Sequence, residues 1–263
     1  MRLAFSTLGL PGVSLAESVR LASEHGFQGL ELRCTAGESV DIVMDAVARE
    51  KARHTLEAAR VTALSVASYV KVAAPGPDAS VLVDLREHLR LAADLDAVGV
   101  RVFPGAGEDV GLEADLRAVR RLTAIADEAQ ALGVRVLLET HDSHRAARDA
   151  TRIVASVGHS AVGILWDVMH TWLAGESPSQ TAAVLRDHLG YIQVKDVAGH
   201  TDLTPLPLGA GVLPLAECLS LVPEDCWVSW EYEAAWYPAA TPLPDLLVAG
   251  AGYLGTLSGA DGS

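Results

Sequence analysis

The 263-residue sequence predicts a single α/β domain with the fold of a (β/α)₈ TIM barrel. Three observations lead to this prediction. Short apolar runs rich in Val, Leu and Ile alternate along the whole chain with longer Ala-, Leu-, Arg- and Glu-rich segments that have helical spacing. Eight such pairs are found, which is the number of βα units that closes a barrel. Half of the residues are hydrophobic, which is enough apolar material for one large core.

The eight expected strands are the apolar runs at residues 3–8, 28–32, 62–67, 99–103, 134–139, 162–167, 191–195 and 227–231. The expected helices follow them at residues 14–25, 41–59, 79–97, 112–131, 145–157, 177–189, 214–221 and 242–257. Glycines suited to left-handed C-caps follow the first, third and fourth helices, at Gly26, Gly99 and Gly133. We therefore expect one domain over residues 1–263, with a frayed tail after about residue 257.

A doubly wound open sheet is the alternative arrangement for alternating strands and helices. It usually carries a Gly-rich phosphate loop of the form GxGxxG after its first strand. The segment from Ser6 to Gly12 in this chain, STLGLPG, does not have that form. The sequence therefore favours the closed barrel.

Composition and charge exclude several classes of partner. The formal net charge is −14 and Lys and Arg form no cluster, so we expect no nucleic-acid partner. No apolar run approaches the roughly 18 residues of a membrane span, so we expect no membrane partner. Cys34, Cys218 and Cys226 form no CxxC pair, and the first residues lead into a strand rather than a signal peptide. We expect a cytoplasmic protein with reduced thiols, and a homo-oligomer is compatible with the sequence.

Acidic residues close three of the expected strands. Glu139 ends VRVLLE, Asp167 ends GILWD, and Glu231 ends WVSWE. Gln193 holds the comparable place in YIQVK. A buried carboxylate costs several kcal/mol unless it is paired or bound to a metal, and all strand ends of a parallel barrel meet at one mouth. The four oxygen donors predict a site for Mn²⁺ or Mg²⁺, with Co²⁺ as a further candidate, unless they only cap loops or form salt bridges.

Several segments resemble those of the xylose isomerase-like TIM barrels, a superfamily of sugar isomerases and epimerases that also includes keto-acid and inosose dehydratases and endonuclease IV. They lie in the family's order over almost the whole chain: GLELR (29–33), LLETHD (137–142), LWDVMH (165–170), IQVKD (192–196), LGAG (208–211) and SWEYE (229–233). The resemblance implies a metal held by Glu139, Asp167, Gln193 and Glu231, most often Mn²⁺. Gln193 stands where most members have His, although some 3-dehydroshikimate dehydratases resemble this sequence in having Gln there.

Further side chains are expected to face the substrate. The resemblance implies that His170, in the loop after the sixth strand, binds a substrate oxygen or moves a proton. Lys195 shares a strand face with Gln193, so it either binds a substrate anion or a developing enolate, or pairs with a neighbouring acid. His141 is expected to bind substrate or to orient a metal ligand, with a hydrogen bond at the rim as the alternative.

Two more candidates come from the second and eighth strands. Glu31 and Arg33 end the second strand, and we expect only one of them to face the pocket; the pattern leaves open which. Arg33 is the candidate substrate ligand of this strand. Trp236, after the eighth strand, is expected to form a wall of the pocket.

The resemblance implies an enzyme that removes a proton α to a carbonyl, with a metal ion that stabilises the enediolate as a Lewis acid. Glu139 and Glu231 are then the base and the acid on opposite faces of the substrate. Our first expectation is an isomerase or epimerase of a small keto-sugar or polyol. The alternative is a dehydratase of a cyclic keto-acid or inosose such as 3-dehydroshikimate, which Gln193 favours. A non-catalytic binding protein is the third expectation. For either enzyme, the expected partner is a small carbohydrate or keto-acid substrate.

Overall fold

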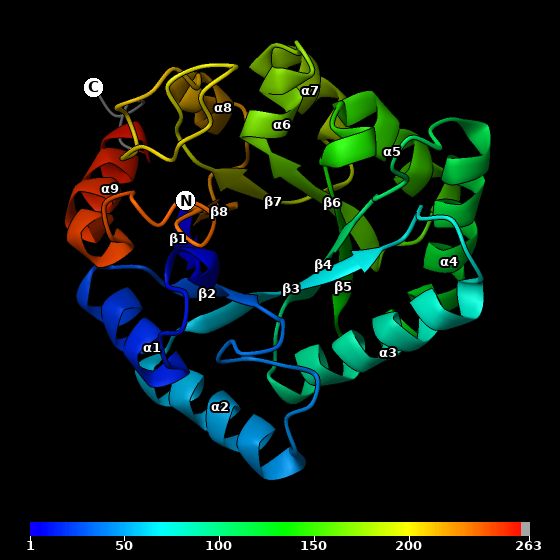
Figure 1. Cartoon of the computed structure of the whole chain (residues 1–263), viewed down its shortest axis with the longest axis horizontal. Helices are drawn as coiled ribbons and strands as arrows, with labels where there is room; N and C mark the ends of the chain where they lie inside the picture. The colour runs from blue at the N-terminus through cyan, green and yellow to red at the C-terminus, as the bar shows by residue number, and fades with distance from the viewer. Residues whose placement is uncertain (259–263) are drawn as a thin grey trace.

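The structure is a computed structural model that describes residues 1–258. Its eight parallel strands close into a barrel in the order β1-β2-β3-β4-β5-β6-β7-β8, and the helices form a ring around them (Figure 1). The strands are β1 (Arg2–Ser6), β2 (Gly29–Arg33), β3 (Thr62–Lys71), β4 (Gly99–Phe103), β5 (Arg135–Glu139), β6 (Val162–Asp167), β7 (Leu189–Val194) and β8 (Trp227–Trp230). The predicted (β/α)₈ barrel is confirmed.

The helices that cover the barrel are α1 (Leu15–Glu24), α2 (Ala46–Ala59), α3 (Asp78–Asp94), α4 (Leu112–Ala131), α5 (Ala147–Val157), α6 (Val168–Leu173), α7 (Pro178–Leu185), α8 (Leu215–Ser220) and α9 (Leu243–Ser258). Two 3₁₀ helices lie at η1 (Thr7–Gly9) and η2 (Asp142–His144). Within residues 1–258, no helix combines the length and the apolar character needed to cross a bilayer. Apart from the last residue of α9, the frayed tail expected after about residue 257 lies outside the described residues.

Capping side chains explain where two helices depart from the expected ranges. α2 begins at Ala46 rather than at residue 41, because the Asp45 carboxylate accepts a hydrogen bond from a backbone N–H of its first turn. α6 was not expected at all. It begins directly after β6 because the Asp167 side chain accepts hydrogen bonds from the backbone N–H groups of Met169 and His170.

The three glycines expected at helix C-caps have different outcomes. Gly26 and Gly133 have φ angles of 78° and 70°, which is the left-handed conformation that a glycine cap supplies. Gly99 instead begins β4. Asp96, with a φ of 53°, takes the left-handed position after α3, so the expected cap at Gly99 was wrong.

Strand ends place the candidate residues at the mouth. β7 ends at Val194 and β8 at Trp230, so Lys195 and Glu231 lie one residue beyond their strands. β3 continues to Lys71 rather than ending at residue 67. The mouth is therefore built from the last residues of the strands and the first residues of the loops.

A small cluster of buried apolar side chains forms a floor beneath the mouth: Ala4, Leu64, Leu137, Leu165, Tyr191 and Trp227. A larger cluster packs the strands against the helices. Leu137, Leu165 and Tyr191 each precede an expected metal ligand by two residues on the same strand, so they share its face. Polar side chains one layer higher are therefore directed into the mouth above an apolar floor.

Arg121, on α4, stabilises the loop between β3 and α3. Its side chain is fully buried and bonds to the Asp78 carboxylate at 2.8 Å. It also donates to the backbone carbonyl oxygens of Val72, Ala74 and Gly76. One guanidinium thus satisfies three backbone carbonyl oxygens of this loop.

Arg121→Met is expected to lower the free energy of unfolding by about 3 kcal/mol, because several carbonyl oxygens lose their donor at once. Arg120→Met is the matched control. Arg120 pairs with the same Asp78, but its side chain is 56% exposed, so a loss below about 1 kcal/mol is expected. Urea denaturation of both variants measures the difference, and equal losses would contradict the role of Arg121.

Candidate active site at the mouth of the barrel

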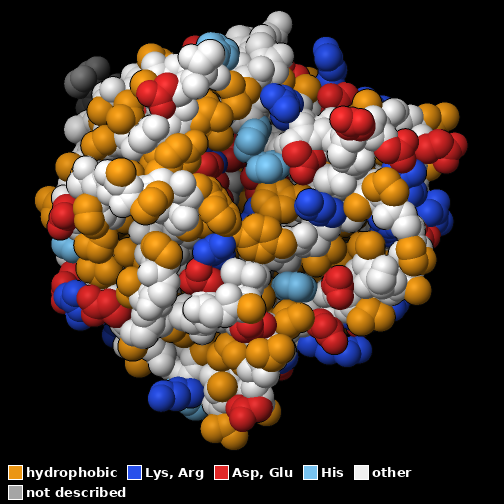
Figure 2. All heavy atoms as spheres, in the orientation of Figure 1, with side chains coloured by type: hydrophobic (Ala, Val, Ile, Leu, Met, Phe, Trp, Pro, Cys, Tyr) orange, Lys and Arg blue, Asp and Glu red, His pale blue; other side chains and the backbone are white. Residues whose placement is uncertain are grey.

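A cavity of about 400 Å³ opens at the C-terminal mouth of the barrel. It is the hollow near the centre of the face in Figure 2, with acidic side chains inside it and histidine side chains at its edge. Its walls come from β3, β4 and β5 and from the segments after β1, β5 and β8, and include Tyr69, Arg101, Phe103, Glu139, Glu231 and Trp236. A space of this size suits a small-molecule ligand.

The four expected metal ligands lie together in a buried polar layer at this mouth. Glu139, Asp167, Gln193 and Glu231 are at most 5% exposed. Glu139 and Glu231 line the cavity, and Gln193 Nε2 lies 3.3 Å from Glu231 Oε1. The Lys195 ammonium joins Asp167 to Glu231. Their common location fits the expectation, while metal binding by these residues stays a prediction.

Lys195 is a buried cation in this layer, with its side chain 3% exposed. Its Nζ lies 2.8 Å from Asp167 Oδ2 and 2.8 Å from Glu233 Oε1, and it also contacts Glu231 Oε2. Burial alone would lower the pKa of Lys195, but the three carboxylates outweigh it and raise the pKa well above its usual value. Of the two expected roles, pairing with neighbouring acids is observed, and substrate binding stays a prediction.

Gln193 is oriented by Glu31. Its Nε2 donates to both oxygens of Glu31, at 2.9 and 2.7 Å, and the Tyr191 hydroxyl donates to the same carboxylate. The amide nitrogen faces the carboxylates because an amide oxygen there would be repelled. The amide oxygen Oε1 is buried and accepts no hydrogen bond from the described residues. A buried oxygen without a donor is the kind of atom that a bound cation satisfies.

Arg101, on β4, is a buried cation that was not predicted. Its side chain is 4% exposed, and Nη1 donates to Glu139 Oε2 at 2.9 Å. The guanidinium lies 4.0 Å from the centre of the Phe103 ring, and its Nε has no acceptor among the described residues. Burial raises the pKa of Glu139 to about 8, although the Arg101 charge opposes the shift. A charged residue inside the apolar run GVRVF was the signal for Arg101, and it was overlooked.

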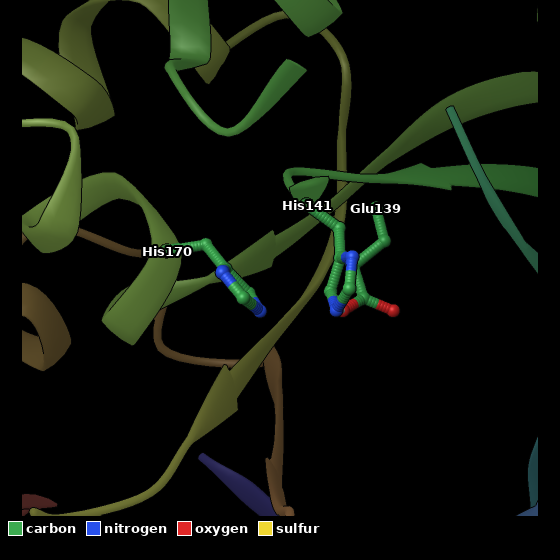
Figure 3. Close-up of side chains that lie close together, drawn as sticks. All are labelled: Glu139, His141 and His170. Atoms are coloured by element: carbon green, nitrogen blue, oxygen red, sulfur yellow. The ribbon is translucent and has the colours of Figure 1, made fainter. Parts of the chain in front are cut away.

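His141 and His170 bring imidazole nitrogens to the corner of the cavity that holds Glu139 (Figure 3). One ligand atom from each of these three residues lies within 4.8 Å of the other two, and the two imidazole centres are 4.1 Å apart. His170 was expected in a loop, but it lies on α6. Because Asp167 caps that helix, one carboxylate both orients His170 and remains in the buried layer.

The two imidazoles have opposite pKa shifts. Burial lowers the pKa of His141, but its hydrogen bond to Asp142 and the nearby carboxylates outweigh burial and raise it. Burial and the charges of His141 and Lys195 lower the pKa of His170 well below its usual value. Near neutral pH, His170 is therefore a neutral imidazole that can accept a proton or bind a metal ion.

Hydrogen bonds support the loop that carries His141. The Ser143 hydroxyl donates to Asp142 at 2.8 Å and lies 2.9 Å from His144 Nδ1. His144 is 2% exposed, and its Nε2 lies 2.9 Å from Asp115 Oδ1. The order Ser, His, Asp is that of a hydrolase triad, but the single Ser143 proton is directed to Asp142. The arrangement therefore positions the loop rather than activating a nucleophile.

The expectation that only one of Glu31 and Arg33 faces the pocket was wrong. The two residues are two positions apart on β2, so strand alternation puts both side chains on one face. Glu31 is buried in the polar layer, and Arg33 extends over the mouth to the Tyr69 hydroxyl at 2.8 Å. The Arg33 guanidinium lies 5.0 Å from the centre of the Trp236 ring. Trp236 lines the cavity and is 54% exposed, which fits its expected place as a wall.

Solved structures share this fold over nearly the whole chain. The probable 3-DHS dehydratase AsbF of Bacillus anthracis has a TM-score of 0.80 and 18% identity, over 97% of this chain and 99% of its own. The IolI protein with a binding zinc atom has a TM-score of 0.83 and 17% identity, over 99% of both chains. D-Psicose 3-epimerase with D-tagatose, from Clostridium cellulolyticum H10, has a TM-score of 0.80 and 13% identity, over 98% of both chains. At these identities the likeness shows the fold alone.

Sequence comparison identifies the family. A family model described as "Xylose isomerase-like TIM barrel" matches residues 19–256, which is most of the chain. The comparison with curated proteins finds no match. The match runs from within α1 to within α9, so it covers β2 to β8, and it agrees with the closed barrel of parallel strands. The chain therefore belongs to the xylose isomerase-like TIM barrel family.

Proposed function

We propose that the chain is a metal-dependent enzyme that removes the proton α to a carbonyl group of a small polyhydroxylated keto compound. The observation that carries the proposal is a pair of buried glutamates, Glu139 and Glu231, which line one cavity. Each is held by a buried cation, Glu139 by Arg101 and Glu231 by Lys195. Burial moves the pKa of Glu139 toward neutrality, to about 8, which is the range in which general acid–base catalysis is effective.

The charges around the cavity fit a divalent cation. Four buried carboxylates are matched by two buried basic side chains, which leaves two formal negative charges when all are ionised: Glu31, Glu139, Asp167 and Glu231 against Arg101 and Lys195. One divalent ion would balance this excess, and Gln193 Oε1 would offer it an oxygen that accepts no hydrogen bond from the described residues.

Glu139, Asp167, Gln193 and Glu231 would hold the ion. Among the described carboxylates, imidazoles and thiols, the ligand atoms found within 4.8 Å of one another are those of Glu139, His141 and His170. The oxygen donors favour Mn²⁺ or Mg²⁺, whereas imidazole nitrogens also suit Co²⁺ and Zn²⁺. When bound, such an ion would polarise the substrate carbonyl as a Lewis acid.

The part of the cavity formed by β3 and β4 carries basic donors that are still available to a ligand, although Arg101 also pairs with Glu139. Arg101 Nε has no acceptor, and Lys71, which also lines the cavity, forms no ion pair with any residue of the described part of the chain. The acids that hold Lys195 lie on the other side, on β6 and after β8. The free Nε of Arg101 and the ammonium of Lys71 favour an anionic group on the ligand, and a carboxylate is the simplest one. The cavity therefore fits a keto-acid better than a neutral sugar.

Dehydration of a cyclic keto-acid is the reaction that this arrangement supports best. Glu139 or Glu231 takes the α-proton, and the electron pair of the C–H bond forms a carbon–carbon double bond. The β C–O bond breaks, and the hydroxyl leaves as water with a proton from a second wall side chain such as His141. Lys195 stays an ammonium, and its positive charge can stabilise negative charge on the carbonyl oxygen.

Isomerisation or epimerisation of a keto-sugar is the second candidate. It is favoured by the positions of Glu139 at the end of β5 and Glu231 after β8, since two acid–base groups on different strands can act on two faces of one substrate. Both candidates share the loss of the α-proton and differ only in the next step.

Proton NMR in D₂O separates the two candidates and tests the proposal. The metal-free protein is loaded with Mn²⁺, and a panel of ketoses, inosose and dehydroshikimate is added after the excess ion is removed. The proposal expects new olefinic or aromatic proton signals from the keto-acid and no change in the ketoses. Epimerised or isomerised ketoses with an unchanged keto-acid would establish the second candidate. If the protein binds no metal and converts none of the compounds, the result favours a non-catalytic binding protein.

Removal of the metal is expected to abolish turnover. The cavity would then hold an excess of negative charge and no Lewis acid for the carbonyl. Dialysis against a chelator should remove all measurable activity, and stoichiometric Mn²⁺ should restore it. Full activity after the chelator, with elemental analysis finding no metal, would contradict the metal-dependent reaction.

A further inference from the structure

Lys195 occupies a place that the proposed metal site also requires. Its ammonium contacts one oxygen each of Asp167 and Glu231, two of the four proposed ligands, and one oxygen of Glu233. Two of its three N–H donors go to Glu231 Oε2 and Glu233 Oε1. Asp167 Oδ2 lies 2.8 Å from Nζ as an ion-pair partner and accepts no hydrogen bond from the described residues.

The oxygens that Lys195 contacts are the ones an ion would use. Asp167 Oδ1 already accepts from the backbone N–H groups of Met169 and His170, at 2.8 and 3.2 Å, which leaves Oδ2 for a cation. Glu231 Oε1 lies beside Gln193 Nε2, and Oε2 faces Lys195. A divalent ion at Asp167 Oδ2 and Glu231 Oε2 would lie against the ammonium, where two positive charges at short range repel strongly.

Glu233 offers the ammonium another partner. It lies at 2.8 Å from Nζ, and its side chain is 19% exposed, whereas those of Asp167 and Glu231 are 0% and 6% exposed. It also lines the cavity and is not among the proposed metal ligands. The lysine side chain has a flexible stem of four methylene groups, so its ammonium can move toward Glu233 while the backbone of β7 stays fixed.

From this geometry, and resting on the metal site of the proposed function, we infer that Lys195 is an internal counter-cation that competes with the metal. Without an ion it holds Asp167 and Glu231 together. When an ion binds, the ammonium leaves these two oxygens and keeps Glu233 as its partner. Lys195 therefore sets the affinity for the metal and keeps the buried carboxylates neutralised in its absence.

Calorimetric titration of the metal-free protein with Mn²⁺ tests this role without any substrate. Lys195→Met preserves the length of the side chain and removes its charge, so Mn²⁺ should bind about tenfold more tightly or better. Its metal-free form should melt at a lower temperature than the parent, and saturating Mn²⁺ should remove most of that difference. Lys51→Met is the control, because Lys51 is an exposed residue of α2 that does not line this cavity, and its Kd should stay within about twofold.

Glu233→Gln gives a second measurement in a protein that keeps the lysine. It weakens the alternative partner of the ammonium, so Mn²⁺ should bind less tightly than to the parent. Unchanged or weaker Mn²⁺ binding by a folded Lys195→Met protein would contradict the proposal that Lys195 competes with the metal ion. If that variant does not fold, unchanged or tighter binding by Glu233→Gln would overturn it instead. If neither the parent nor the variants bind Mn²⁺, the proposed metal site is overturned, and the role of Lys195 with it.

Discussion

Glu139→Gln is expected to lower kcat by about 10³-fold, and Glu231→Gln by a similar factor, while the fold is retained. The amide has the size of the carboxylate, so the packing of the buried layer changes little. It cannot accept a proton from carbon, and it replaces an anionic oxygen beside Arg101 or Lys195 by a neutral group. Turnover of the substrate found by NMR measures the effect, and circular dichroism checks the fold.

Two further measurements separate catalysis from structure for these variants. Glu128→Gln is the control, since Glu128 is a partly exposed partner of Arg86 on α4 that does not line the cavity, and its kcat should be unchanged. The Kd for Mn²⁺ shows whether a variant has lost the ion or only the acid–base group. Near-normal kcat in either cavity variant would remove that glutamate from the proposed reaction.

The barrel and the location of its mouth were predictable because they depend on local patterns. Glu139 and Asp167 stand at the ends of strands of 5 and 6 residues, and the energetic cost of burying a carboxylate marks such positions in any sequence. The same reasoning applies to Arg101 inside GVRVF, where the pattern was present but not used. The expectation that only one of Glu31 and Arg33 faces the pocket overlooked the alternation of side chains along a strand, which the sequence also contains.

The contacts inside the layer were not predictable, because barrel closure makes them between residues distant in sequence. Gln193 is oriented by Glu31, 162 residues earlier, and Lys195 is held by Glu231, 36 residues later. Sequence reasoning left the role of Lys195 open between substrate binding and ion pairing, and only the distances to the carboxylates distinguish the two. The helix α6 was missed for a related reason, since its cap is the side chain of Asp167, which had been assigned to the metal alone.

Arg101→Met is expected to raise KM for a keto-acid substrate by about a hundredfold. A guanidinium that gives charge-assisted hydrogen bonds to a carboxylate contributes about 1.5–3 kcal/mol, which corresponds to one to two orders of magnitude in binding. Arg101 is available for this contact because Nη1 holds Glu139, while Nε has no acceptor within residues 1–258. Steady-state kinetics with the keto-acid and with its neutral analogue, in which an alcohol replaces the carboxylate, measure the effect.

The comparison of the two substrates decides what Arg101 does. If it binds the carboxylate, the substitution should raise KM for the keto-acid and leave KM for the neutral analogue nearly unchanged. Loss of the cation beside buried Glu139 should also lower kcat for both, because that carboxylate then has a higher pKa and is less often ionised. Arg101→Lys keeps the charge but loses the planar fork, so it should restore kcat more fully than KM. An unchanged KM for the keto-acid in Arg101→Met, with kcat reduced, would mean that Arg101 only positions Glu139, and the site would then favour a neutral keto-sugar.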